Sequence, residues 1–195
     1  MAASAPCKYR AFLSYSHHDT GVAKRLHGRL EGFRIDKDLV GRDTAMEPIP
    51  KRLAPIFRDR HDFDAGGALR AQTVGALNDA AALVLLASPH SAASRPVNAE
   101  VALFRERHPE RPLIPLILDG EPNASEKGNA ARECFPSTLR EEGDVLAADL
   151  RDSGDGRELA LAKVVARLLG LAPDAPSLSI VAGRLRGIRS LRAEI

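Results

Sequence analysis

Tryptophan is absent from this chain of 195 residues, and the aromatic content is only 4%. Proteins that bind single-stranded nucleic acid without sequence preference stack the bases on aromatic side chains, so this composition gives little support for that function. An excess of charge of one sign is also lacking, because 28 Lys and Arg residues are balanced by 26 Asp and Glu residues. A balanced surface creates no strong field for a polyanion. We therefore expect no direct contact with nucleic acid.

Long hydrophobic runs and cysteines are scarce as well. The longest apolar candidate, Ala80 to Ala87, is far shorter than the ~20 residues that a membrane-spanning helix needs. The two cysteines, Cys7 and Cys134, are too few for a disulfide framework and have no CxxC spacing. The N-terminus lacks the basic region and hydrophobic stretch of a secretory signal. These absences predict a cytoplasmic protein with reduced thiols and no membrane span.

Most short catalytic motifs are missing too. The sequence contains no GxGxxG, GxxxxGK[ST], GxSxG or HExxH motif, which argues against phosphate-binding loops and serine hydrolases. The segment His61–Asp64 combines one histidine with two aspartates, but no second group at a known metal-ligand spacing accompanies it. We therefore expect no metal site.

What the sequence does contain is an alternation of apolar patterns with two different periods. Strands are expected at residues 9–15, 56–60, 81–87, 113–118 and 145–150, and helices at residues 22–33, 69–80, 97–107 and 157–169. Strands that alternate with helices predict an α/β fold with a doubly wound parallel sheet. Asp19 or Thr20 is expected to cap the first helix, and Gly170 to end the fourth. Pro115 favours an edge position or a bulge for its strand, because proline donates no hydrogen bond.

The chain is expected to divide into a flexible lead (residues 1–7), one domain (residues 8–172) and a C-terminal segment (residues 173–195). Residues 34–55 fit neither period and are interpreted as a long, insertion-like excursion within the domain. The C-terminal segment has apolar residues at helical spacing with arginines on the other side, which predicts a short basic amphipathic helix. This helix either packs on the domain or links it to another one, or it docks on a membrane surface or partner.

Polar residues directly after the strands are the candidates for a site, because ligands of doubly wound sheets bind outside the carboxyl ends of the strands. Three clusters are expected to converge there: Ser16, His17 and His18 after the first strand; Asp62, Phe63, Asp64, Gly66 and Gly67 after the second; and Ser88, Ser91, Ser94, Asn98 and Glu100 after the third. Other interpretations stay open. The two histidines can be solvated loop residues, and Ser91, Ser94 and Asn98 can be capping groups.

Three segments resemble the Toll/interleukin-1 receptor (TIR) domain family. Residues 9–16 (YRAFLSYS) look like its opening strand, residues 64–67 (DAGG) before a helix are similar to its BB loop, and residues 83–104 (LVLLASPHSAASRPVNAEVALF) resemble its third strand and following helix. Together they relate most of residues 8–170 to the family. The resemblance implies a flavodoxin-like five-stranded parallel sheet, the TIR fold. It also implies the activity of many bacterial and plant members, which cleave NAD at the nicotinamide–ribose bond.

The resemblance also implies roles for single residues. The family's catalytic glutamate falls on Glu100, and NAD is then the substrate, with no cofactor expected. The residues expected to contact the substrate are Ser16, His17, Phe63, Asp64, Ser91, Ser94 and Asn98. The BB-loop residues expected to mediate self-association through TIR–TIR contacts are Asp62, Phe63, Asp64, Ala65, Gly66 and Gly67. In the family such assembly often completes the active site, and a sensor domain or partner protein is a possible trigger.

One carboxylate is enough for this chemistry, because nicotinamide leaves NAD as a neutral molecule and needs no general acid. A glutamate beside the ribose hydroxyls would stabilise the oxocarbenium-like transition state. Capture of the sugar by water gives ADP-ribose, and capture by the adenine of the same molecule gives a cyclic ADP-ribose. From spacing alone, however, Glu100 is better explained as an exposed first-turn glutamate favoured by the helix dipole, and only the family resemblance favours the catalytic role.

Two departures from the family pattern keep an alternative open. Pro96 stands where many members carry Trp, four residues before the glutamate, and residues 34–55 are longer than the usual link. Both favour a catalytically silent TIR interaction or adaptor module. A nucleoside transferase or related N-glycosidase is a third possibility, since similar sheets carry carboxylates that act on nucleosides. The leading hypothesis is a bacterial-type TIR domain that hydrolyses or cyclises NAD on assembly, in immunity or cell-suicide signalling.

Overall fold

Five parallel strands form one sheet in the order β2-β1-β3-β4-β5 in the computed structural model. The strands are β1 (Ala11–Ser14), β2 (Ile56–Arg58), β3 (Leu83–Ala87), β4 (Leu113–Ile117) and β5 (Ala148–Asp149). The structure describes residues 7–44, 46, 48–58, 71–141, 143, 145–172 and 175–190. This order is that of flavodoxin-like doubly wound sheets, so the predicted fold class is confirmed.

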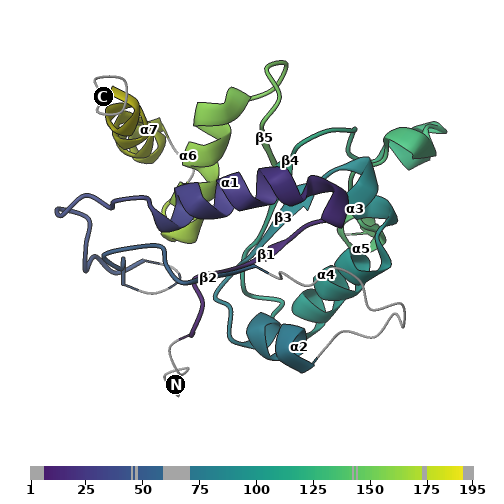
Figure 1. Ribbon diagram of the computed structural model, residues 1–195, viewed down its shortest axis with the longest axis horizontal. Helices are drawn as coiled ribbons and strands as arrows, with labels where there is room; N and C mark the ends of the chain where they lie inside the picture. Colours follow the sequence, from purple (N-terminus) through teal and green to yellow (C-terminus); the bar gives the residue numbers. More distant parts are fainter. Residues whose placement is uncertain are drawn as a thin grey trace.

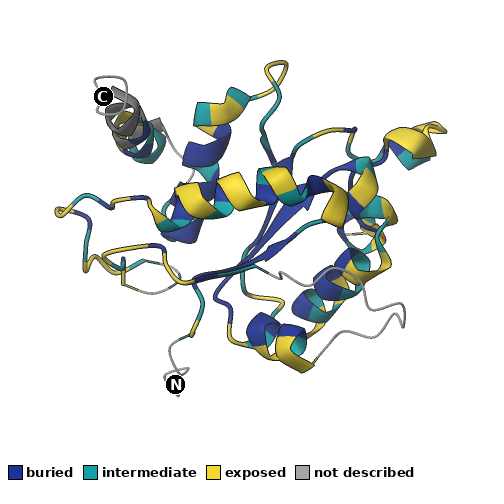
Figure 2. Cartoon of the chain, viewed as in Figure 1, coloured by how far each residue is buried: buried dark blue, intermediate teal, exposed yellow. Residues whose placement is uncertain are grey.

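Helices cover both faces of the sheet (Figure 1). One face carries α1 (Thr20–Glu31) and α6 (Gly156–Leu168), and the other carries α2 (Ala71–Asn78), α4 (Arg95–Arg107) and the short α5 (Ser137–Glu141). Central strands of a parallel sheet are buried on both faces and read as continuous apolar runs, as β3 does with LVLLA. Its residues alternate between the two cores, with Val84 and Leu86 toward α1 and α6 and the others toward α2 and α4. Figure 2 shows the buried sheet between helices whose outer faces are exposed.

Residues 90–95 are not the loop that the sequence predicts, because a short helix, α3 (Pro89–Ala93), occupies most of them. Ser88 and Ser91 form a capping box, in which the Ser88 Oγ accepts from the Ser91 N–H (3.1 Å) and the Ser91 Oγ accepts from the Ser88 N–H (2.8 Å). Pro89 at the first helical position has the backbone angle that a helix start requires. The capping groups therefore start a helix five residues long, too short for its periodicity to be recognised.

The edge position predicted for Pro115 is wrong, because β4 pairs with β3 on one side and β5 on the other. Pro115 itself pairs in register with Leu85 of β3, so the strand has no bulge at this position. Residues two positions apart in a strand direct their backbone groups to the same side, and the Ile117 carbonyl accepts from the Leu150 N–H after β5. The side of Pro115 that lacks an N–H is therefore the side of β5. The register between β4 and β5 covers only Leu116 and Ile117 among the described residues. Proline is tolerated there because the neighbouring strand begins just beyond it.

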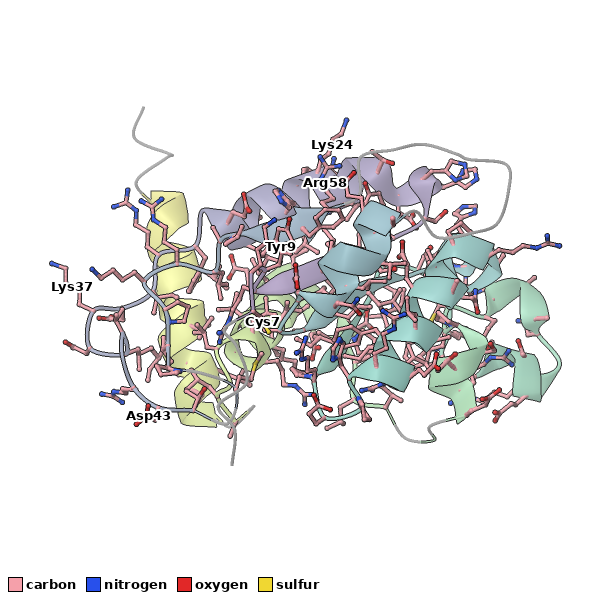
Figure 3. All side chains as sticks on the ribbon, turned by 90° about the horizontal axis from the view of Figure 1, so that it is seen from below. Cys7, Tyr9, Lys24, Lys37, Asp43 and Arg58 are labelled. Atoms are coloured by element: carbon pink, nitrogen blue, oxygen red, sulfur yellow. The ribbon has the colours of Figure 1, made fainter. Side chains whose placement is uncertain are left out.

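Residues 34–55 connect the end of α1 to the start of β2, and both lie at the amino edge of the sheet. The segment is irregular but contributes Ile35, Leu39, Ile49 and Leu53 to the core on the α1 side. In Figure 3, Lys37 and Asp43 from this segment project outward at one end of the molecule. Because the carboxyl edge is the opposite one, the excursion does not line a site at the carboxyl ends of the strands within one chain.

The C-terminal helix α7 (Ala175–Ser190) packs against α6. Val181 and Leu185, two of the apolar residues that the sequence places on one face, are buried in the core on that side. Packing on the domain, one of the alternatives that the sequence leaves open, is therefore observed. The preceding α6 ends as predicted at Gly170, whose φ of +70° lets the Leu171 N–H return to the Ala166 carbonyl (2.9 Å).

The irregular stretch after β4 is organised by one buried carboxylate, which the sequence did not reveal. Glu133 accepts backbone N–H bonds from Asn123 (3.2 Å), Ser125 (3.0 Å) and Phe135 (2.9 Å) and so holds the turns η2 (Ala124–Lys127) and η3 (Ala130–Arg132). Burial raises the pKa of Glu133, but the hydrogen bonds from Phe135 and Ser125, together with the nearby charge of Arg140, outweigh it and hold the pKa below its usual range. Within the described part of the chain, no helix is long and apolar enough to cross a membrane.

Candidate functional site

The carboxyl ends of β1 and β3 lie side by side at the point where the sheet changes its winding direction. After β1 the chain enters the short turn η1 (His17–Asp19) and then α1 on one face, whereas after β3 it enters α3 and then α4 on the other. The two connections separate at this point, which is where ligands usually bind in this class of fold. Two of the three predicted clusters, those after the first and third strands, converge there as expected.

Glu100 and Ser14 form the centre of this site. The Ser14 Oγ, at the end of β1, donates to Glu100 Oε2 at 2.5 Å, and the glutamate is only 7% exposed. The interpretation of Glu100 as an exposed first-turn residue is therefore wrong. The helix starts at Arg95, earlier than predicted, with Ser94 as N-cap, so Glu100 lies in its second turn and points to the sheet. Burial strengthens the electrostatic effect of a carboxylate on a developing positive charge.

A second buried carboxylate, Asp19, lies at the same edge. It is 8% exposed and its Oδ2 accepts a hydrogen bond of 2.6 Å from the Ser88 Oγ. Asp19 occupies the predicted N-cap position of α1, but its side chain makes no capping bond. Asp19 is therefore at the predicted position, but the predicted capping hydrogen bond is absent. Its carboxylate instead joins the segment after β1 to the segment after β3.

Ser16, His17 and His18 lie where the sequence places them, directly after β1. Ser16 is buried, and its carbonyl accepts from the Asp19 N–H at 2.8 Å. The two histidines are exposed, and their rings contact each other with centroids 3.9 Å apart. The ring of His18 also stacks on that of His90 from α3, at 4.4 Å. The histidines are thus exposed but ordered by ring contacts across two connections.

Ser91, Ser94 and Asn98 make the structural contacts that the capping interpretation predicts. Ser91 completes the capping box of α3, and Ser94 is the N-cap of α4, with its Oγ 3.5 Å from the Val97 N–H. The Asn98 Nδ2 donates to the carbonyls of Ala92 and Ser94, at 2.8 Å each. These polar groups therefore have partners in the chain itself, and a contact of any of them with substrate stays a prediction.

The predicted BB-loop residues Asp62, Phe63, Asp64, Ala65, Gly66 and Gly67 lie outside the described residues. The last described residue before them is Arg58 at the end of β2, which lies close to α1 (Figure 3). Its Nη1 donates to the Tyr15 hydroxyl at 3.1 Å.

Pro96, the departure from the family pattern, is exposed in the first turn of α4.

A further charged cluster follows β4 and β5, away from the switch point. The Arg151 Nη2 pairs with Asp149 Oδ2 at 2.7 Å, and its Nη1 donates to the Gly120 carbonyl at 2.6 Å. The Arg151 guanidinium lowers the pKa of the Asp149 carboxyl, and Asp149 in turn raises the pKa of Arg151. These bonds tie the loop after β5 to the loop after β4. In the described part of the chain, no group of three or more His, Cys, Asp or Glu side chains is arranged to hold a metal ion.

Sequence reasoning missed three relationships at the switch point: the bond between Ser14 and Glu100, the pairing of Asp19 with Ser88, and the ring contact of His90 with His18. Ser14 carried one usable signal, because it is polar at a position where the alternation of β1 directs the side chain to the α4 face, as for Phe12. Ser88 was singled out by its place after the third strand and Asp19 as a cap, but nothing in the sequence pairs them with each other or brings His90 to His18.

Comparison with known proteins adds three findings. A family model described as the TIR domain matches residues 11–165. A curated protein, NAD(+) hydrolase ApTIR from Actinoplanes sp. (strain ATCC 31044 / CBS 674.73 / SE50/110), is 33% identical over 114 residues, which are 58% of this chain and 14% of that protein. The TIR domains in a structure of the activated Roq1 resistosome directly recognizing the pathogen effector XopQ align at 21% identity, covering 90% of this chain and 84% of that chain, with a TM-score of 0.44.

Proposed function

The chain belongs to the TIR domain family, and from this premise we propose that it cleaves NAD at the nicotinamide–ribose bond. The observation that carries the proposal is Glu100, a buried carboxylate that accepts a hydrogen bond from Ser14 at the switch point of the sheet. The resemblance to the family independently assigns the catalytic role to the same residue. The similarity to a protein named as an NAD(+) hydrolase supports this choice of substrate.

In the proposed reaction, Glu100 binds the hydroxyls of the nicotinamide ribose and stabilises the positive charge that develops on the sugar as the bond to nicotinamide breaks. The leaving group takes the bonding electron pair and becomes neutral nicotinamide, so no proton has to be supplied. Ser14 orients the carboxylate through its 2.5 Å hydrogen bond. Because Glu100 is largely shielded from water, its charge acts on the transition state with little screening.

Water or the adenine of the same molecule then captures the sugar at its anomeric carbon. Water gives ADP-ribose and adenine gives a cyclic ADP-ribose, and the proposal includes both outcomes. It also includes self-association through residues 62–67, control by a sensor or partner, and a role in bacterial immunity or cell-suicide signalling. These last three elements rest on the family resemblance alone.

A catalytically silent TIR interaction module is the second candidate, and Pro96 favours it. This residue is exposed in the first turn of α4, one turn before Glu100, where it provides no aromatic surface. Residues 34–55 give this candidate little support. They lie at the amino edge of the sheet, so within one chain they do not block access of a substrate to Glu100.

The deciding experiment incubates the purified protein with NAD at high protein concentration, with a crowding agent to promote assembly. Nicotinamide, ADP-ribose and cyclic products are followed by chromatography for the parent protein and for Glu100→Gln. A matched control is Glu106→Gln, which removes an exposed carboxylate from the same helix. The proposal expects nicotinamide release by the parent and by Glu106→Gln, and none by Glu100→Gln. Equal release by Glu100→Gln would remove this residue from the mechanism, and no release by the parent would favour the interaction module.

A further inference from the structure

Three exposed imidazole rings lie in a row at the switch point of the sheet, and we call this row the histidine stack: the ring of His90 stacks on that of His18, and the ring of His17 is tilted against the ring of His18. The central ring is that of His18, whose centroid lies 3.9 Å from that of His17 with an interplanar angle of 40°, and 4.4 Å from that of His90 with an angle of 24°. His17 and His18 follow β1, and His90 follows β3. The stack therefore lies at the same switch point of the sheet as Ser14 and Glu100.

The buried hydrogen bond between Asp19 and Ser88 explains why the rings meet. Asp19 directly follows His18, and Ser88 lies two residues before His90, so the bond between their side chains holds the two segments together. The capping box of α3 fixes the Ser88 end, and the turn η1 fixes the Asp19 end. The rings thus stack on a rigid support while all three side chains stay exposed.

We propose that the His17–His18–His90 stack binds a planar heteroaromatic ring of the dinucleotide substrate. This rests on the proposed function, because NAD carries two such rings, nicotinamide and adenine, and Glu100 is assigned to the ribose of one of them. Aromatic side chains bind bases by stacking because every base presents a π-face. A stack that is already ordered loses little conformational freedom when another ring is added to it. His18 and His90 thereby become substrate-binding residues beside His17.

The test measures NAD binding by calorimetry in a Glu100→Gln background, so that the substrate is not consumed. It compares this background with the added pair His18→Ala/His90→Ala and the ring-retaining pair His18→Phe/His90→Phe. The control is Lys24→Ala, whose side chain projects from α1 away from the body of the molecule (Figure 3). The alanine pair is expected to raise the Kd about tenfold, and the phenylalanine pair and the control to change it less than about twofold.

Two fragments identify which ring is bound. AMP carries the adenine half of NAD, and nicotinamide mononucleotide carries the other half. The alanine pair is expected to weaken the binding of one fragment and leave the other unchanged. In the active protein with Glu100 intact, the same pair is expected to raise KM for NAD and leave kcat within about twofold, because the rings contribute equally to ground state and transition state.

The stack is not a binding surface if the alanine pair, shown to be folded by its thermal unfolding, binds NAD as tightly as the background protein. Weak binding by the phenylalanine pair would also overturn the proposal, because ring stacking would then not be the cause of binding. Absence of NAD binding by the background protein would overturn it as well. A parent protein that binds NAD but never releases nicotinamide would refute the proposed function alone, and the binding comparison would still decide the role of the stack.

Discussion

The hydroxyl of Ser14 donates a hydrogen bond to the carboxylate of Glu100, which joins residues 86 positions apart in the sequence. One residue ends the first strand of the sheet, and the other lies in the helix that follows the third strand. The bond therefore fixes the orientation of the candidate catalytic carboxylate to the sheet itself. A carboxylate on a strand–helix contact of this kind is held more rigidly than one on a loop.

Substitution of Ser14 by alanine tests this orientation. A hydrogen bond to a charged group contributes about 1.5–3 kcal/mol, so Ser14→Ala is expected to lower kcat/KM for NAD by about one to two orders of magnitude. The matched control is Ser137→Ala, an exposed serine on α5. Steady-state kinetics on both variants provide the measurement, and circular dichroism checks that they fold. If Ser14→Ala retains full activity, Glu100 is positioned without this bond.

A double-mutant cycle tests the buried pair of Asp19 and Ser88. Each substitution by alanine is expected to destabilise the protein by about 1–3 kcal/mol, because each leaves a buried polar partner without its hydrogen bond. Ser88→Ala also removes the cap of α3, but the cycle isolates the pairwise part, expected at about 1–2 kcal/mol. Urea unfolding of the four proteins gives these values. Additive effects would mean that the bond makes no net contribution to stability.

His108, at the end of α4, predicts acid sensitivity of the fold. Burial, with Arg111 and Arg107 nearby, lowers its pKa from the ordinary value of 6.5, against an opposing effect of Glu110. The unfolded chain therefore binds more protons than the native state between the two pKa values. Stability contributed by the neutral ring is complete above pH 6.5 and is lost as pH falls through the native pKa.

We expect the free energy of unfolding of His108→Gln to fall less steeply between pH 6.5 and pH 5 than that of the parent. The variant keeps the other titratable groups, so the difference in slope belongs to this histidine. Urea unfolding at several pH values measures it, and parallel pH profiles of the two proteins would contradict the prediction.

Cys134 is expected to be chemically inert in the folded protein. Its side chain is fully buried, and burial together with the nearby Glu133 raises the pKa of the thiol to about 12. Only the thiolate reacts with disulfide reagents such as DTNB. In a Cys7→Ser variant, labelling at pH 8 should therefore be more than about a hundredfold slower for the native protein than in guanidinium chloride. Equal rates in both states would show that this part of the core opens readily.

Much of the fold follows from local sequence patterns. The apolar run of β3 and the helical spacing of α4 and α6 each involve residues close together in the chain, so their types and approximate positions can be predicted. Their alternation implies a parallel doubly wound sheet, because parallel strands need helical crossovers. The helix α3 and the exact ends of β5 were not predictable, since very short elements show no period.

Only two features of the sequence predicted residues of the site: their position directly after a strand, and the resemblance to the family. Glu100, Ser16 and His17 were identified in this way, and the structure places them at one switch point. The structural roles of Ser91, Ser94 and Asn98 were left open by the sequence, because a serine or asparagine near a helix start can serve either as a cap or as a ligand.

The sequence by itself determined the order of strands and helices, the edge at which a site forms and the candidate catalytic glutamate. Only the tertiary structure decided which polar groups pair: Ser14 with Glu100, Asp19 with Ser88, and His18 with both His17 and His90. The physical reason is that helices and strands arise from short-range periodicity. Hydrogen bonds between buried side chains depend on which strands become neighbours in the sheet, and that order places β1 beside β3 although a whole strand and two connections separate them in the chain.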